Sequence, residues 1–426
     1  MWNPVGRAVI LTLLLLRAPS VRSDDWPQWR GPNRDGVCTE TGLFESFPTD
    51  GLKIRWRVPV GWGFSSPVVA KGRVFLADSE VIKPQAKERV QCFDEATGNT
   101  LWTYVYDVDY EDWAFDPSQE IGPVATPIVQ NGKVYTVGRC GHVFCFDARN
   151  GDVLWQRNMA QDYQVAFAAG SPSPLVEGDL LIVFAGGKSG ACIVAVHKDT
   201  GADVWKALDE SLTYSSPIVL NAGGKRQLIV WTQQSVTSLD PAAGTIYWQQ
   251  RLATSGAYAV STPVVDNDRL LIGGLMFQLD SDKPAGTVLW PASKAPARRI
   301  YSHTSTALFR GDHLYSAKSS GELVCVDASN GAQVWESTEV TKLKSGASIH
   351  LTPNGDSVLL YTDEGVLIRA QLSPDGYQEI SRVAVLEPTF PFGGKKVAWS
   401  PPAYANHCIF ARNGKELICA SLAVGR

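Results

Sequence analysis

A short apolar run, a polar turn and a second apolar run ending in tryptophan recur along the whole chain. At 144–155 the sequence reads FCFDARNGDVLW, with Asp147, Gly151 and Trp155 at intervals of four residues. This pattern predicts a β-hairpin, because a glycine that can take a positive φ closes a tight turn between two strands. Full copies occur as FDEATGNTLW, VHKDTGADVW, LDPAAGTIYW and VDASNGAQVW at 93–102, 196–205, 239–248 and 326–335, and 284–290 keeps the second half. The chain is therefore predicted to be a repeat protein.

Two independent counts of the repeat give eight copies. The strands that carry a tryptophan number seven, and a strand without one at 377–382 makes the eighth; the seven residues are Trp56, Trp102, Trp155, Trp205, Trp248, Trp290 and Trp335. Runs that open on small residues, mainly serine, threonine or alanine, precede a strand at 65–67, 125–127, 171–174, 215–217, 261–263, 305–307 and 400–402, with a weaker one at 348–350. Their spacing suits a four-stranded unit, and small residues suit strands that crowd around one axis. We therefore expect an all-β, eight-bladed propeller of four-stranded antiparallel blades, with each tryptophan wedged between neighbouring blades.

The two ends of the chain have complementary defects. Residues 52–60 read as a strand that carries Trp56 with no hairpin before it, whereas 401–422 supplies three strands and no tryptophan strand after them. We expect the N-terminal strand to complete the last blade and close the ring, so that no sheet edge stays free. This divides the chain into a leader at 1–23, an extended arm at 24–50 and the propeller at 51–426. Trp26 and Trp29 are expected to pin the arm against the propeller surface.

The first 23 residues read as a secretory signal. Arg7 precedes the apolar run 9–16, Arg17 ends that run too early for it to span a membrane, and small residues precede Asp24. Cleavage there would remove three arginines and no carboxylate, which lowers the net charge from −4 to −7. The mature protein is expected to be soluble, periplasmic or extracellular, and without a stable membrane anchor. Its acidic balance also argues against nucleic acid as a partner.

The eight cysteines fall into two groups. Cys92, Cys145, Cys325 and Cys419 share one repeat position, two residues before the aspartate or its equivalent. Equivalent positions on different blades lie too far apart to bridge, so buried free thiols are predicted there. The disulfide status of the irregular set, Cys38, Cys140, Cys192 and Cys408, stays open.

The D-x-x-x-G-x-x-x-W motif resembles the tryptophan-docking repeat of the pyrroloquinoline quinone (PQQ)-like propeller superfamily. Together with DDWPQWRGPNRDG at 24–36 and GGKRQLIVWT at 223–232, it resembles the exported members, which are similar to the outer-membrane protein assembly propeller lipoprotein. The resemblance implies the fold, whereas propellers host unrelated functions. Quinoprotein dehydrogenases of the superfamily carry a vicinal disulfide and a calcium site, but this chain has no adjacent cysteines. PQQ and Ca²⁺ are thus implied by resemblance only, and the residues themselves predict no cofactor.

The repeat register gathers polar and aromatic residues at one mouth of the central channel. They are Trp62, Arg139, Phe167, Lys188, Tyr214, Tyr258, His303, Lys318 and Trp399. Such a mouth suits an anionic or planar ligand. The same large residues would equally well plug the channel, and the sequence does not separate the two interpretations.

The connection at 104–122 is the longest and most acidic. Asp107, Asp109 and Asp112, with Glu111, Asp116 and Glu120 nearby, are of the ligand type that Ca²⁺ prefers, although the spacing lacks the glycine and terminal glutamate of an EF-hand. The alternative is a solvated acidic loop. Either way, a long loop on a rigid scaffold is a candidate place for a partner to bind.

Three functions remain open at this point. No catalytic set is recognisable, which favours an exported, non-catalytic propeller that binds a protein or peptide through its channel mouth or a loop face. The alternative is a quinone-binding oxidoreductase with a degenerate site. The third is a carbohydrate-active or other small-molecule enzyme that uses the acidic loop, which would require paired carboxylates across one cleft. A monomer fits a closed ring, but the sequence leaves the oligomeric state open.

Overall fold

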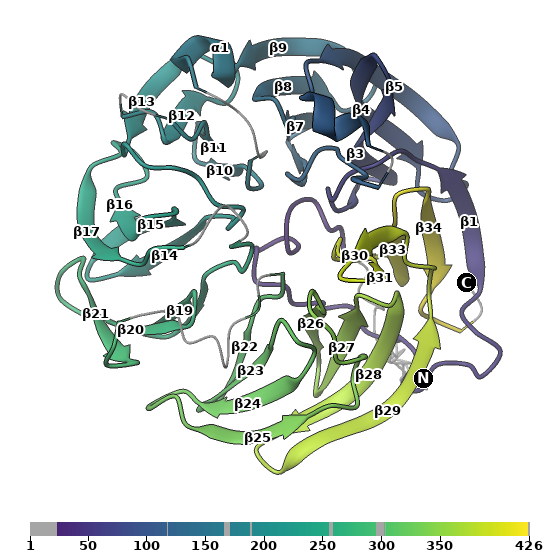
Figure 1. Ribbon diagram of the computed structural model, residues 1–426, viewed down its shortest axis with the longest axis vertical. Helices are drawn as coiled ribbons and strands as arrows, with labels where there is room; N and C mark the ends of the chain where they lie inside the picture. The colour runs from purple at the N-terminus through teal and green to yellow at the C-terminus, as the bar shows by residue number, and fades with distance from the viewer. Residues whose placement is uncertain are drawn as a thin grey trace, which may run out of the picture.

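Eight four-stranded antiparallel sheets stand around a central axis in the computed structural model (Figure 1). The structure describes residues 24–116, 118–165, 171–187, 190–254, 259–294, 302 and 304–424. In each sheet that comes from one stretch of chain, the strands follow chain order from the axis outward, as expected for a propeller blade. The eight-bladed prediction is therefore confirmed, including the blade whose outer strand has no tryptophan, β29 (Gly376–Ala384).

The blades have the following bounds. The first two are β2 (Val68–Ala70), β3 (Arg73–Ile82), β4 (Gln85–Asp94) and β5 (Thr100–Val108), then β6 (Ile128–Gln130), β7 (Lys133–Val137), β8 (His142–Asp147) and β9 (Val153–Asn158). The third and fourth are β10 (Leu175–Glu177), β11 (Leu180–Phe184), β12 (Ile193–His197) and β13 (Asp203–Ala207), then β14 (Ile218–Ala222), β15 (Lys225–Trp231), β16 (Ser235–Leu239) and β17 (Ile246–Arg251). The fifth and sixth are β18 (Val264–Asp266), β19 (Arg269–Ile272), β20 (Leu275–Leu279) and β21 (Gly286–Trp290), then β22 (Leu308–Arg310), β23 (His313–Ala317), β24 (Leu323–Asp327) and β25 (Gln333–Ser337). The seventh is β26 (Ile349–Asn354), β27 (Ser357–Thr362), β28 (Val366–Ser373) and β29, and the last is β32 (Ala403–Ala405), β33 (Cys408–Arg412), β34 (Glu416–Ser421) and β1 (Ile54–Pro59).

The N-terminal strand β1 closes the ring. It pairs antiparallel with β34, with Trp56 opposite Cys419 and Pro59 opposite Glu416. In Figure 1 this purple strand accordingly lies along the yellow end of the chain. The last blade takes its strands from both ends of the sequence, as the complementary defects of the two ends predicted.

The ring has two faces that differ in what they carry. One, called here the hairpin face, carries the turns between first and second strands and the D-x-x-x-G hairpins. The other, the connection face, carries the turns between second and third strands and the segments that lead from blade to blade. Those segments include the 3₁₀ helix η1 (Asp112–Phe115), the helix α1 (Met159–Tyr163) and an additional hairpin, β30 (Phe390–Phe392) with β31 (Lys395–Val397). The sequence did not reveal this last hairpin.

Indole rings join neighbouring blades at their outer edges. Six tryptophans donate the indole N–H to a backbone carbonyl of the following blade at 2.8–3.1 Å; the pairs are Trp56–Glu95, Trp102–Ala148, Trp155–Lys198, Trp205–Pro241, Trp290–Ala328 and Trp335–Ser373. Trp248 instead donates to Gln227 of its own blade. The hairpin that follows Trp248 is the incomplete repeat copy, which explains why this contact differs.

A chain of hydroxyl groups joins the innermost strands. The backbone N–H just before one inner strand donates at 2.9–3.1 Å to the hydroxyl at the same position of the next blade; the pairs are Ser66–Thr126, Thr126–Ser173, Ser173–Ser216 and Thr262–Thr306. The small residues at these positions therefore do more than relieve crowding. They satisfy buried backbone donors between neighbouring blades, where an unpaired N–H would be costly.

The arm at 24–50 enters the central channel. Trp26 pairs through its backbone with Val69 of β2, Pro27 accepts from Val129 of β6, and the indole of Trp29 donates to Thr262 at 2.9 Å. In Figure 1 the purple N-terminal segment accordingly crosses the centre of the ring. Trp26 and Trp29 are buried among the inner strands, so the expectation that they pin the arm against the propeller surface was wrong.

Farther along, the arm contacts the remaining side of the channel. Arg34 donates to the carbonyls of Pro174 at 2.8 Å and Pro217 at 3.2 Å, and Cys38 N–H donates to Pro353. The arm thereby hydrogen-bonds to blades on all sides of the axis. An arm that satisfies carbonyls of several blades fills the channel and braces the ring.

All eight cysteines are free thiols, and every one except Cys140 is buried. The four at the shared repeat position lie on inward-facing strand positions, as predicted. Among the described residues, no helix is long and apolar enough to cross a membrane.

Candidate functional site

Two of the residues predicted for the channel mouth, Arg139 and Trp399, contact different segments of the connection face. Arg139 donates its backbone N–H to Glu88 at 3.0 Å, and its guanidinium lies 5.7 Å from the ring centre of Trp113. Trp399 donates its indole N–H to Gly346 at 2.8 Å and packs against aromatic rings of the β30–β31 hairpin. Each of the two thus supports a different inter-blade connection.

Two other predicted residues, Trp62 and Lys318, also have partners of their own. Trp62 forms a backbone bridge with Ser79, and Lys318 forms an ion pair with Glu336 of its own blade. Tyr214 is half-buried beside the inner end of its blade. Lys188 and His303, together with Phe167 and Tyr258, lie outside the described residues.

One small cavity lies in the described part of the channel. A cavity of about 30 Å³ remains between the arm and the inner strands, next to Trp29, Thr306 and His350. That volume accommodates about one water molecule. Burial lowers the pKa of His350 to about 4, because an imidazolium would lose its hydration there, and the ring nitrogen contacts the carbonyl of Trp399 at 2.9 Å.

The acidic connection 104–122 does not gather its carboxylates. Asp107 is exposed and lies 3.9 Å from the Lys87 ammonium, whereas Asp112 begins η1 and Asp109 contacts the thiol of Cys140 through its backbone carbonyl. Within the part of the chain that the structure describes, no group of three or more His, Cys, Asp or Glu residues could hold a metal ion.

A buried carboxylate fixes this acidic connection to the propeller. Glu88 on β4 is fully buried and accepts from Tyr106, from Tyr110 at 2.7 Å and from the N–H of Arg139. Burial raises the pKa of Glu88, and the three donors oppose that rise. The sequence analysis missed Glu88, because its alternation on β4 looks like that of any other polar residue.

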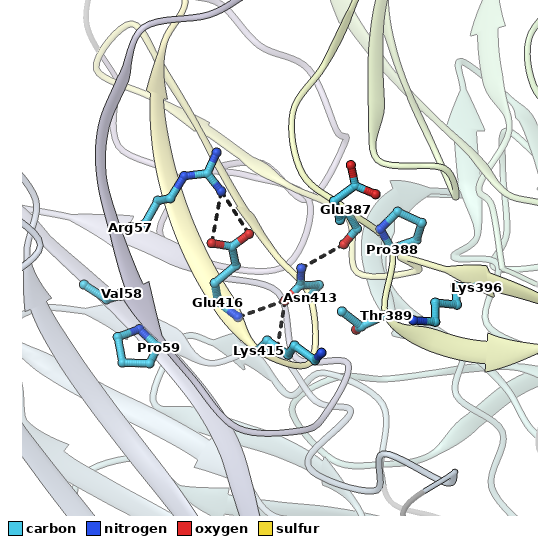
Figure 2. A pocket seen from close by; sticks show the side chains of 10 residues that line it. All are labelled: Arg57, Val58, Pro59, Glu387, Pro388, Thr389, Lys396, Asn413, Lys415 and Glu416. Atoms are coloured by element: carbon cyan, nitrogen blue, oxygen red, sulfur yellow. Dashed lines mark hydrogen bonds and ion pairs between the residues drawn. The ribbon is translucent and has the colours of Figure 1, made fainter.

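A groove of about 730 Å³ lies on the connection face. Figure 2 shows it between β1, the β33–β34 turn and the segment that leads into the β30–β31 hairpin. The ten lining residues are Arg57, Val58, Pro59, Glu387, Pro388, Thr389, Lys396, Asn413, Lys415 and Glu416. None of them was predicted as a site residue, because strands from both ends of the chain must meet before the groove exists.

The groove combines charged rims with a partly apolar floor. Arg57 and Glu416 form an ion pair at 2.9 Å across the β1–β34 seam, while Lys396 and Lys415 belong to two other segments of the wall. Val58, Pro59 and Pro388 add apolar surface. Such a surface is typical of polypeptide recognition rather than of a closed small-molecule pocket.

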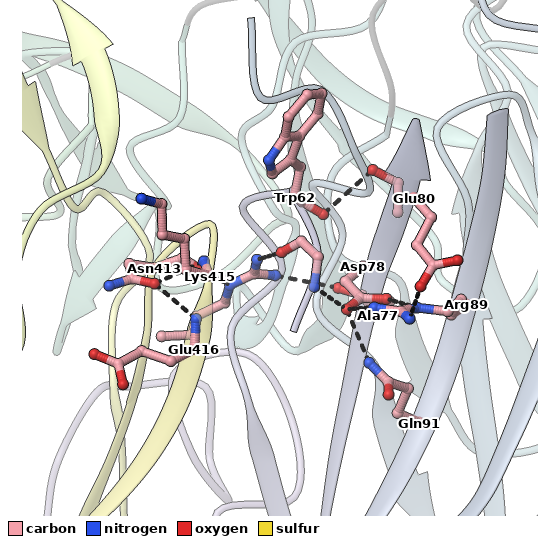
Figure 3. A network of polar contacts seen from close by, with 12 residues as sticks. Trp62, Ala77, Asp78, Glu80, Arg89, Gln91, Asn413, Lys415 and Glu416 are labelled. Carbon is pink, nitrogen blue, oxygen red and sulfur yellow. Dashed lines mark hydrogen bonds and ion pairs between the residues drawn. The ribbon is translucent and has the colours of Figure 1, made fainter. Parts of the chain in front are cut away.

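A rigid polar network lies behind the groove (Figure 3). Asp78 is fully buried and accepts from Nε and Nη2 of Arg89 at 2.8 and 2.7 Å and from Gln91 at 2.8 Å. Arg412, also buried, donates to Gly61 at 2.6 Å and to Asn413 at 3.0 Å, and burial lowers its pKa to about 10. In Figure 3 the indole of Trp62 points away from Asp78 and Arg89. The network therefore holds the β33–β34 turn that forms one wall of the groove.

Comparison with known proteins agrees with this architecture. The profile of a family described as outer membrane protein assembly factor BamB matches residues 48–197, 86–279, 189–351 and 278–379. BamB from Moranella endobia is 22% identical over 256 residues, 55% of this chain and 63% of that protein. The quinoprotein alcohol dehydrogenase PedH from Pseudomonas putida is 28% identical over 154 residues, 32% of this chain and 25% of that protein. The chain thus aligns with less than two thirds of the length of these relatives.

Solved structures give the same fold at low identity. BamB from Moraxella catarrhalis superposes with a TM-score of 0.57 at 16% identity, covering 87% of this chain and 99% of that one. Quinohemoprotein alcohol dehydrogenase from Comamonas testosteroni superposes with a TM-score of 0.64 at 14% identity, covering 96% and 82%. The family profile spans overlapping stretches that together cover most of the propeller, so the chain belongs to the BamB family of PQQ-like repeat propellers.

Proposed function

We propose that this chain is an exported, non-catalytic PQQ-like propeller that binds a protein or peptide through its connection face. The observation that carries the proposal is the arm inside the channel, which leaves a cavity of about 30 Å³ there, whereas the open groove of about 730 Å³ lies at the junction of the first and last blades. The groove offers a ligand of peptide size far more room than that cavity does.

The chemistry of the groove supports this choice. Its ion pair, lysines and apolar floor provide contacts for an extended polypeptide that carries acidic side chains. The connection 104–122 adds exposed carboxylates and the exposed indole of Trp113 on the same face. The name of the related BamB proteins, outer membrane protein assembly factor, also fits an envelope location and a protein partner.

The test is capture of partners from the exported fraction by the immobilised protein. Charge reversal of both groove lysines, Lys396→Glu with Lys415→Glu, should abolish the recovery of a protein that the unmodified chain retains. The matched control is Lys53→Glu with Lys225→Glu, two exposed lysines at the hairpin face, which should leave recovery unchanged. Equal recovery by all three proteins would place binding elsewhere.

A PQQ titration tests the alternative oxidoreductase. With and without Ca²⁺, no saturable change in absorbance and no rise in melting temperature are expected, because a ligand that binds the native state raises the melting temperature as its occupancy increases. A saturable shift would revive the quinone-binding hypothesis.

A further inference from the structure

One carboxylate of the arm is buried and has no ion-pair partner among the described residues. Glu40 is 4% exposed and lies at the hairpin face, where the arm leaves the channel beside the β32–β33 turn. Its two oxygens accept the backbone N–H of His407 at 3.1 and 2.9 Å. Among the described residues, the ion pairs include none with Glu40, and burial raises its pKa. A buried carboxylate without a counter-charge is costly.

A further donor to Glu40 is the backbone nitrogen of Asp24, 3.2 Å from Oε1. Two other contacts place this nitrogen there. The Asp24 carboxylate accepts the hydroxyl of Thr39, next to Glu40, and the backbone pairing of Trp26 with Val69 fixes the chain two residues later. The nitrogen is thus positioned by the arm and the inner strand, independently of any charge that it carries.

The sequence predicts cleavage immediately before this residue. Hydrolysis by an export peptidase would break the bond between the Ser23 carbonyl carbon and the Asp24 nitrogen, with water as the second reactant. Ser23 would keep the new carboxylate, and the Asp24 nitrogen would take up a proton and become an ammonium group. The Asp24 nitrogen, which is a neutral amide donor before cleavage, would then supply a positive charge beside Glu40.

We propose that Glu40 is the receptor for the amino terminus formed by cleavage between Ser23 and Asp24, so that processing locks the arm inside the channel. The ammonium group and the buried carboxylate form an ion pair that exists only in the processed chain. Because the arm hydrogen-bonds to blades around the whole axis, this local pair stabilises the complete ring. The proposal concerns the hairpin face and does not rest on the interaction proposed for the connection face.

The test compares four proteins. A chain beginning at Asp24, which contains the whole described propeller, is prepared with a tag removed without residue, and a second chain carries Gly-Ser ahead of Asp24. Each is made with Glu40 and with Glu40→Gln. The extension should lower the melting temperature by several degrees when Glu40 is present and by clearly less in the Glu40→Gln background, because only the first pair loses an ion pair. Equal losses in both backgrounds would overturn the proposal.

A second measurement does not depend on a variant that folds well. The Asp24 amine beside a carboxylate should have a pKa above the usual value of about 7.7–8.0, so acylation at pH 7 should be slowed about tenfold for each unit of that rise. Glu45→Gln, at an exposed carboxylate of the same arm, should leave the rate unchanged, and unfolding should restore an ordinary rate. An ordinary rate in the native protein, or an exported chain that begins elsewhere than Asp24 by mass spectrometry, would refute the proposal.

Discussion

At the residue scale, five of the seven docking tryptophans pack closely on a positive-φ glycine of the next blade. Gly151 has a φ of +77°, and a Cβ there would lie 2.7 Å from the ring of Trp102. Gly98, Gly201, Gly244 and Gly331 repeat the same approach to the tryptophan of the blade before them. The motif therefore couples two requirements in one position: a left-handed turn and the absence of a side chain under an indole.

Two glycines of the second blade allow the cost of the left-handed backbone to be measured apart from the cost of crowding the indole. Gly132→Ala, at φ +76° with nothing within 4 Å of the new methyl group, should cost about 1 kcal/mol of unfolding free energy from backbone strain alone. Gly151→Ala, at nearly the same φ, should cost about 1–3 kcal/mol more, because the methyl group displaces Trp102. Urea unfolding of the two variants measures the difference. Equal losses would mean that the indole contact does not limit this position.

His350 should make the protein sensitive to acid. Its pKa in the folded state is lowered from 6.5 to about 4, by burial first and by nearby Arg30, against the opposing contact with Trp399. The unfolded state then binds more protons between these values, so stability is complete above about pH 6.5 and falls as the pH drops toward 4, by up to about 3 kcal/mol. His350→Gln, which can still donate to Trp399, should flatten this part of the curve of unfolding midpoint against pH. If the variant's unfolding midpoint fell with pH as steeply as before, His350 would not be the source of the acid sensitivity.

At the element scale, local pattern located the strands of the blades but not the path of the arm. Strands such as β8 and β9 were predicted because their alternation and turn residues lie within a dozen positions. The arm residues Trp29 and Arg34 find partners in Thr262, Pro174 and Pro217, which are more than a hundred positions away. A Pro/Gly-rich segment has no hydrophobic periodicity from which such contacts could be predicted.

The β30–β31 hairpin was missed for a related reason. Its strands have three residues each and are anchored by long-range contacts: the Lys395 ammonium lies 2.6 Å from the buried carboxylate of Asp363. Phe390 and Phe392 also pack on Trp399. Short strands stabilised by partners on another blade fall below what alternation can detect.

At the scale of the whole molecule, stability depends on closing the ring. The β1–β34 pairing joins residues separated by roughly 360 positions and leaves no sheet edge between the last blade and the first. An open ring would expose the edge of β34, which is a template for pairing with another chain.

Two truncations test the closure. A chain that begins at Gly51 loses the arm but keeps β1, and should remain monomeric with a lower melting temperature, because the channel is no longer braced. A chain that begins at Gly61 also loses β1 and should self-associate through β34. Size-exclusion chromatography with light scattering distinguishes the two. If the second chain were monomeric and as stable as the first, ring closure would contribute little to stability or to protection against self-association.

The repeated hairpin motif by itself determined the number of blades, their strand order and the closure by β1, because these follow from short-range periodicity and from the complementary defects of the two ends. The tertiary structure alone decided which residues meet at the surfaces and in the channel. It placed the arm in the channel, brought Arg57, Lys396 and Lys415 around one groove, and set the Asp24 nitrogen against Glu40. Residues such as Trp62 and Trp399 occupy comparable repeat positions, yet they serve different connections. Periodicity specifies the scaffold, whereas sites arise where non-repeating segments meet, and their contacts leave no local pattern in the sequence.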